Sequence, residues 1–118
     1  MRDPHKLKAF ELADNLAVLV YQETRNFPKE ELFGLVSQMR RAAVSVPSNI
    51  AEGCGRSSEK EYLQFLSVAY GSLKELEYQI SLSKKLGFLN NETDLPARAD
   101  ETARVLNGLI KALKTRAG

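Results

Sequence analysis

Adjacent arginines are the residues in this sequence whose type and spacing most directly indicate chemistry. Arg40 and Arg41 lie in a helical pattern, where consecutive residues are separated by roughly 100° and cannot fully share one face. An arginine fork can bind a phosphate through paired hydrogen bonds, so both residues are candidates for contacting nucleic acid. The alternative is that one of them pairs with a carboxylate on a neighbouring helix, such as Glu75 or Glu77, while the other is solvated.

A glycine-rich stretch, residues 53–58, precedes a predicted helix start. The first turn of a helix has free N–H groups and the positive end of the helix dipole, and can therefore bind an anion. Arg56 and Lys60 would join such a contact. The stretch lacks the spacing of a nucleotide P-loop, and a plain interhelical turn is the other interpretation. The candidate nucleic-acid-binding residues are thus Arg40, Arg41, Arg56 and Lys60.

Cysteine and histidine chemistry is limited to one residue of each kind, Cys54 and His5. A closed zinc site needs about four ligands, usually Cys and His, so this chain alone cannot build one. A nucleophilic cysteine needs a base or a lowered pKa, and nothing near Cys54 in the sequence supplies either. We therefore predict no enzyme, no catalytic residues, no metal site and no cofactor.

Apolar residues recur at helical spacing along nearly the whole chain, and no strand-like alternation is present. The spacing predicts four amphipathic helices. Their apolar stripes cover about residues 6–25, 32–53, 58–86 and 93–113. Short connections favour antiparallel neighbours, so the predicted fold is an all-α, up-down-up-down four-helix bundle in one domain, residues 1–118.

Capping and stop signals bound the third helix. Ser58 and Glu61 have the spacing of a capping box, in which the serine hydroxyl accepts from a free backbone N–H. Gly87 is expected to end this helix in the left-handed conformation. The same conformation is expected at the end of the second helix, at Gly53 to Gly55.

Pro47 lies inside the second helical pattern, where proline removes one backbone donor. A kink is expected there, or a restart of the helix capped by Ser45 or Ser48. Asn49 and Glu52 follow the proline and could form a polar site at the kink. Alternatively, Ser45, Ser48 and Asn49 satisfy the backbone groups that the proline frees.

The composition is that of a globular protein, with 43% hydrophobic and 27% charged residues. The N-terminus leads into no signal-type apolar run, and the most apolar stretch, 16–21, is far shorter than the ~20 residues that span a bilayer. A single cysteine cannot form an intrachain disulfide and fits a reducing compartment. We expect a cytoplasmic protein with no membrane partner.

One long motif carries a family resemblance. It runs through 38–53 and 55–57, and continues at Glu61, 65–66, Ala69, 71–73, 75–77 and 86–87. Its Arg-Arg-Ala-Ala…Pro-Ser-Asn-Ile-Ala-Glu-Gly core closely resembles the signature of the 23S rRNA intervening-sequence protein family. The resemblance implies an antiparallel four-helix bundle and a homopentameric, barrel-like assembly. A related branch, the accessory variability proteins of diversity-generating retroelements, is basic and associates with a reverse transcriptase and nucleic acid.

Two functional hypotheses follow. In the first, a non-enzymatic homo-oligomer, expected to be a pentamer, binds RNA or DNA by gathering weak basic patches, among them Lys111, Lys114 and Arg116. The net charge of +2, from 17 Lys and Arg against 15 Asp and Glu, is low for that role. In the second, the chain is a structural or protein-interaction module without nucleic-acid binding. Helix three carries more aromatic residues than one narrow core stripe requires, which favours association: Tyr62, Phe65, Tyr70 and Tyr78.

Overall fold

Four long α-helices make up most of the structure, a computed structural model that describes residues 2–117. The helices are α1 (Lys8–Thr24), α2 (Leu35–Cys54), α3 (Glu59–Lys85) and α4 (Leu95–Ala117). Two short 3-10 turns, η1 (Pro4–Lys6) and η2 (Lys29–Glu31), precede α1 and α2. No strand occurs in the part of the chain that the structure describes. The predicted all-helical, four-helix fold is confirmed.

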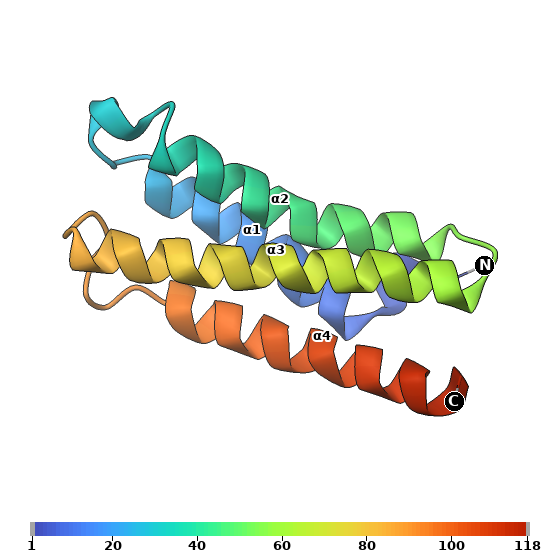
Figure 1. The fold of residues 1–118 in the computed structure, drawn as a ribbon. Helices are drawn as coiled ribbons and strands as arrows, with labels where there is room; N and C mark the ends of the chain where they lie inside the picture. Colours follow the sequence, from blue (N-terminus) through green and yellow to red (C-terminus); the bar gives the residue numbers. More distant parts are fainter. Residues whose placement is uncertain (1, 118) are drawn as a thin grey trace.

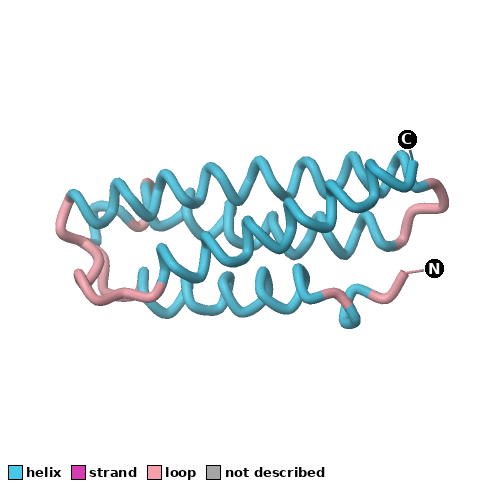
Figure 2. Tube along the Cα trace, turned by 90° about the horizontal axis from the view of Figure 1, so that it is seen from below, coloured by secondary structure: helices cyan, strands magenta, loops and turns pink. Residues whose placement is uncertain are grey.

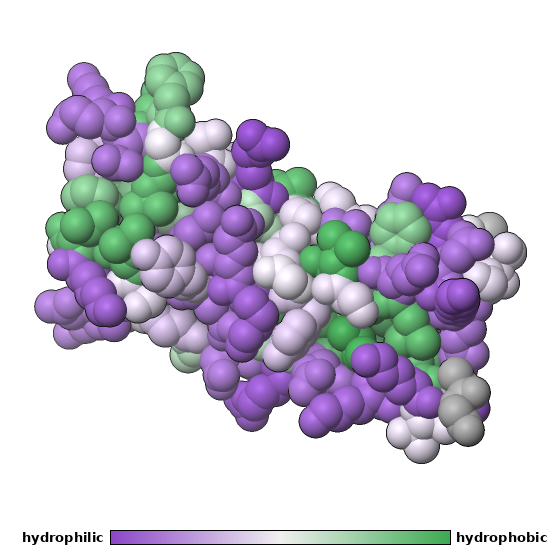
Figure 3. All heavy atoms as spheres, in the orientation of Figure 1, coloured by the Kyte–Doolittle hydropathy of each residue, from purple (hydrophilic) through white to green (hydrophobic). Residues whose placement is uncertain are grey.

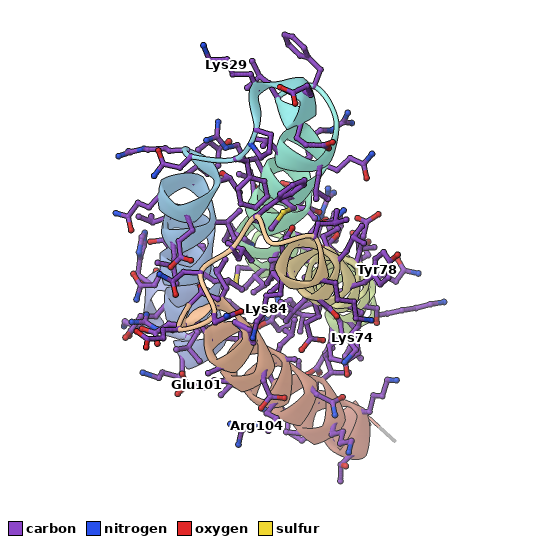
Figure 4. The ribbon with its side chains drawn as sticks, turned by 90° about the vertical axis from the view of Figure 1, so that its left-hand side faces the viewer. Lys29, Lys74, Tyr78, Lys84, Glu101 and Arg104 are labelled. Carbon is purple, nitrogen blue, oxygen red and sulfur yellow. The ribbon has the colours of Figure 1, made fainter. Side chains whose placement is uncertain are left out.

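Each helix packs against its neighbour in sequence, and α1 closes the set by packing against α4 (Figures 1 and 4). This arrangement is compatible with the predicted up-down-up-down order, and Figure 2 shows the loops confined to the two ends of the bundle. The molecule measures 46 × 22 × 20 Å along its principal axes. The elongated shape separates two chemically different ends by the length of a helix.

The two ends differ in which parts of the chain they contain. At one end Arg2 Nη1 donates to the carbonyl of Arg56 at 3.1 Å, and Arg116 Nη2 donates to Glu59 Oε1 at 2.8 Å. Both ends of the described chain therefore lie beside the α2–α3 turn, and we call this the terminal end (right-hand side of Figure 1). The α1–α2 and α3–α4 connections lie at the opposite end, which we call the connection end.

The core is a continuous cluster of side chains from all four helices. Leu16, Met39, Leu73 and Leu106, one from each helix, are each no more than 1% exposed. Burying an aliphatic side chain of this size contributes about 1.5–3 kcal/mol, so the predicted stripes are a major source of stability. The stripe of α3 is buried as predicted at Tyr62, Leu66, Ala69, Leu73, Leu76 and Ile80, whereas Phe65 is only partly buried.

The start of the second helix was predicted wrongly. Leu32 was expected on its inner face but is 49% exposed, because α2 begins three residues later. The preceding segment is instead a tight turn, in which Glu31 N donates to the carbonyl of Pro28 and Leu32 N to that of Lys29. The Glu31 carboxylate then accepts from Leu35 N at 3.1 Å and so satisfies a free donor of the first turn of α2.

Pro47 does not restart α2, which continues as one helix from Leu35 to Cys54. Asn49 Nδ2 donates to the carbonyl of Ser45 at 2.8 Å, and the hydroxyls of Ser45 and Ser72 lie 2.8 Å apart. The side chains around the proline therefore bind the backbone of α2 and the neighbouring helix α3, but neither contact is with the carbonyl of Ala43, which loses its donor at Pro47.

The helix ends agree with the sequence signals in part. Ser58 Oγ accepts from Glu61 N at 3.1 Å, as the capping box predicts. Gly87 has a φ of 79° and is the only positive-φ residue in the described chain, so its predicted role is confirmed. The left-handed ending predicted for α2 is wrong: Gly55 has a φ of −83°, and Gly53 lies within the helix. There the chain turns directly from α2 into the segment capped by Ser58.

Candidate functional site

The four candidate nucleic-acid residues lie near opposite ends of the bundle. Arg40 and Arg41 are on the first half of α2, towards the connection end, whereas Arg56 and Lys60 are at the terminal end. Sixteen residues of mostly helical chain separate Arg40 from Arg56, which is about 24 Å along the axis. That distance exceeds a Debye length of about 8–10 Å, so the two pairs do not act as one charged patch.

Arg40 is tied to α1. Its Nε donates to Thr24 Oγ1 at 3.0 Å and its Nη2 to the carbonyl of Tyr21 at 3.4 Å. The guanidinium also lies 4.6 Å from the centroid of the Tyr21 ring. These contacts hold Arg40 half-buried between two helices, and none of them is with a carboxylate.

Arg41 is exposed and lines a polar groove of about 350 Å³ between α2 and α3, together with Ser45, Glu75 and Gln79. Within residues 2–117 neither Glu75 nor Glu77 pairs with it; Glu77 instead binds Lys74 at 2.9 Å. The alternative of an interhelical Arg–Glu pair is therefore not found for either arginine.

Arg56 has partners of its own at the terminal end. Its Nη2 donates to Glu52 Oε1 at 3.1 Å, and its guanidinium lies 4.6 Å from the centroid of the Phe65 ring. Arg2, which the sequence reading did not select, lies beside it with its guanidinium 4.0 Å over the ring of Tyr62. A cleft of about 520 Å³ lined by Arg2, Gly55, Arg56 and Ser57 opens next to the start of α3.

Further lysines lie at this end. Lys60, Lys111 and Lys114 are exposed, and none of them makes an ion pair in the described part of the chain. We define the basic end as Arg2, Arg56, Lys60, Lys111 and Lys114. Only the folded topology brings them together, because residue 2, the α2–α3 turn and the last turns of α4 are far apart in sequence. The half of the bundle at this end contains eight Lys or Arg and six Asp or Glu, whereas the other half contains nine of each kind.

Cys54 and Tyr62 lie buried beneath this surface, 1% and 2% exposed. Burial raises the pKa of the Cys54 thiol. Burial, and secondly the neighbouring Cys54, raise the pKa of Tyr62 to about 12. A thiol with a raised pKa is a poor nucleophile, and His5 is exposed with its ring against Phe10. No group of three metal-ligating side chains occurs among the described residues.

Large apolar side chains are exposed on several faces. Phe33 is 92% exposed, which is the highest value among them, and the sequence reading did not single it out. Its position between Pro28 and Gly34, in a connection, is the signal that could have done so. Green apolar side chains are visible on the α2–α3 side in Figure 3. The exposed set comprises Val18, Tyr21, Leu32, Phe33, Val44, Val68, Tyr78 and Leu86.

Comparison with protein families identifies the family of this chain. A family model described as "23S rRNA-intervening sequence protein" matches residues 5–108, which include all of α1, α2 and α3 and more than half of α4. No curated protein matches the chain. Among residues 2–117, none of the helices has the length and apolar character needed to cross a membrane.

Proposed function

The chain belongs to the 23S rRNA-intervening sequence protein family, and we propose that it is a cytoplasmic, non-enzymatic homo-oligomer that binds nucleic acid through its basic end. The observation that supports this most is the gathering of Arg2, Arg56, Lys60, Lys111 and Lys114 around one end of the bundle. Non-specific nucleic-acid binding depends on such clustered cations, since each phosphate contact releases counterions.

Oligomerisation would multiply a modest charge. One chain carries a net charge of +2, which is little for a nucleic-acid-binding protein working alone. The family resemblance implies five copies, and a ring that places five basic ends on one rim would present 25 cationic side chains of this set. Three of the exposed apolar side chains, Tyr21, Leu32 and Phe33, line one groove and support self-association, because exposed apolar patches mark interaction surfaces.

We propose that the protein is not an enzyme because its cysteine and histidine cannot act as a catalytic pair. The only cysteine is buried with a raised pKa, and the only histidine is exposed near the start of the chain. A catalytic pair would need nucleophile and base within hydrogen-bond reach.

The test is fluorescence anisotropy with a structured RNA across a salt series. We expect affinity to fall steeply as salt increases. Replacing Lys60, Lys111 and Lys114 by glutamine should weaken binding and lower the salt slope by about 0.7–0.9 for each phosphate that the variant no longer binds. The matched control replaces three lysines at the connection end, Lys29, Lys84 and Lys85, and should bind as the unmodified protein does. Binding that is undetectable at low salt, or insensitive to salt, would refute nucleic-acid binding.

A protein-interaction module without nucleic-acid binding is the second candidate. It is favoured by the exposure of Phe33 and Tyr78, 92% and 66%, which nucleic-acid binding at the basic end does not use. Both proposals include an oligomer, and light scattering tests it: a monomer at micromolar concentration would contradict both. An oligomer that ignores RNA supports this second candidate.

A further inference from the structure

Phe33 is held outward by an ordered turn. Backbone hydrogen bonds join Glu31 N to the carbonyl of Pro28 and Gly34 N to the carbonyl of Glu31, and the Glu31 carboxylate binds Leu35 N. The aromatic ring contacts little of its own chain, being 92% exposed. A large apolar side chain on a pre-organised turn loses little conformational entropy on binding, which is a property of interface anchors.

The groove beside Phe33 is positively charged, and the nearest carboxylates along the chain, Glu30 and Glu31, belong to the preceding turn and are not among its lining residues. A groove of about 320 Å³ is lined by Tyr21, Leu32, Phe33, Val36, Arg40 and Arg41, which we call the arginine face. No acidic side chain is among its described lining residues. Two copies of this face would bring four arginines together, and like charges across an interface cost several kcal/mol. The face is therefore suited to a different, acidic surface rather than to itself.

An acidic surface occurs on the adjoining side of α1. A cleft of about 600 Å³ lies between the end of α1 and the α3–α4 connection, and its described lining residues include no lysine or arginine. Glu23, Glu92 and Asp94 supply the negative charge, and Phe88 supplies a partly buried aromatic ring. Thr93 donates a hydrogen bond to Glu23 and so joins the connection to α1. We call this surface the acidic cleft.

We propose that the arginine face of one copy docks into the acidic cleft of a second copy, with Phe33 as the anchor. The inference rests on the self-association in the proposed function and names the two surfaces that would form it. Arg41 is exposed and without an ion pair in the described chain, so it is free to meet a carboxylate of the other copy. The two surfaces are unlike, so the contact is head-to-tail and can repeat.

The placement of the two surfaces favours a closed ring. Both lie at the connection end, on either side of α1, as the positions of Lys29 beside α2 and of the α3–α4 connection in Figure 4 illustrate. A rotation about an axis along the bundles brings one surface onto the other while keeping all bundles parallel. A head-to-tail contact gives a closed ring when its rotation returns to the first copy and an open filament when it does not, and surfaces on adjoining sides of a bundle favour the ring. All basic ends then lie on the same rim.

The experiment uses two variants that each disable one surface, with mass measured by light scattering and analytical ultracentrifugation. Phe33→Ser removes the anchor, and Glu92→Lys combined with Asp94→Asn removes the net negative charge of the cleft, because only Glu23 then remains acidic and the introduced lysine offsets it. Each variant alone should be monomeric, with association weakened about 30-fold or more. Val68→Ser, which removes a 54% exposed apolar side chain from α3, is the matched control and should assemble normally.

Mixing the two disabled variants is the decisive step. The first retains a working cleft and the second a working arginine face, so the mixture should form one-to-one heterodimers and nothing larger. If the cleft variant assembles as well as the unmodified protein, the arginine face binds another surface and the inference is wrong. If the unmodified protein is itself a monomer, the self-association in the proposed function fails instead. Circular dichroism of each variant confirms that it is folded.

Discussion

Arg40 Nε donates to the hydroxyl of Thr24 across the α1–α2 interface, at 3.0 Å. Thr24 is 2% exposed and itself donates to the carbonyl of Val20 at 2.7 Å, so its oxygen has a fixed position. Adjacent arginines in the sequence thus have different surroundings: Arg40 joins two helices, while Arg41 is exposed at the groove between α2 and α3.

Replacing each arginine by alanine should separate these roles. Arg40→Ala removes two hydrogen bonds from a charged donor and should lower the free energy of unfolding by about 1.5–3 kcal/mol. Arg41→Ala should change it by no more than about 0.5 kcal/mol, as expected for an exposed residue. Urea denaturation measures both, at a concentration where each variant is monomeric. Equal effects would contradict the assignment of Arg40 to the helix interface.

Gly53 is predicted to resist substitution. A Cβ atom there would lie 2.9 Å from Phe65 Cβ and 3.1 Å from Tyr62 Cδ1. Gly53→Ala should therefore push α2 away from α3 and cost about 1–3 kcal/mol. Gly108→Ala is the control, because a Cβ at that position of α4 meets nothing within 4 Å. Gly108→Ala should stabilise the helix by up to about 1 kcal/mol. Thermal unfolding should therefore show a lower melting temperature for Gly53→Ala and a higher one for Gly108→Ala.

Tyr62 should make stability depend on pH in alkaline solution. Its folded pKa of about 12 lies above the ordinary value of 10.0, because burial disfavours the phenolate. The contribution of the Tyr62 side chain to the free energy of unfolding is therefore fully present below about pH 10 and is lost as pH rises towards 12. Tyr62→Phe should lose stability less steeply across that window than the unmodified protein. Tyr78→Phe, at a 66% exposed position, should follow the unmodified protein; parallel curves for all three would refute the assignment.

Gln79, like Tyr62, has a buried polar group whose effect on stability can be tested. Its side chain is 4% exposed, and Oε1 is the one buried side-chain polar atom without a hydrogen-bond partner among the described residues. Leaving such an acceptor unpaired costs about 1–3 kcal/mol. Gln79→Met keeps the length of the side chain and should leave stability unchanged or raise it. A clear loss in chemical denaturation would mean that the oxygen does have a partner in solution. Gln64→Met, on the exposed side of α3, should have little effect.

The sequence allowed the helices and their inner faces to be predicted because burial follows helical periodicity. The stripes of α3 and α4 and the cap at Ser58 needed only local information. Leu32 was misplaced because its spacing continues the α2 pattern, and periodicity cannot detect that the backbone is already in a 3-10 turn. Hydrogen bonds to Glu31 determine where the helix begins.

The candidate site was less predictable, for a topological reason. Arg40 and Arg41 are neighbours in sequence, yet one is committed to Thr24 and the other is exposed. Arg2 and Arg56 are 54 residues apart, yet they share a hydrogen bond and a cleft. Periodicity assigns a residue to a helix face but does not say which helix ends meet, and that determines which charges become neighbours.

Arg2 binds the α2–α3 turn at Arg56 and Arg116 binds the start of α3 at Glu59, which has a consequence for how the chain could be rearranged. Because residues 2 and 116 both lie at this end and α1 packs against α4, the four helices form a cycle, in which α4 is followed in space by α1. A circular permutant that joins these ends with a short linker and opens within residues 90–92 would keep every helix–helix contact. The order of the helices along the chain is thus separable from the order in which they pack.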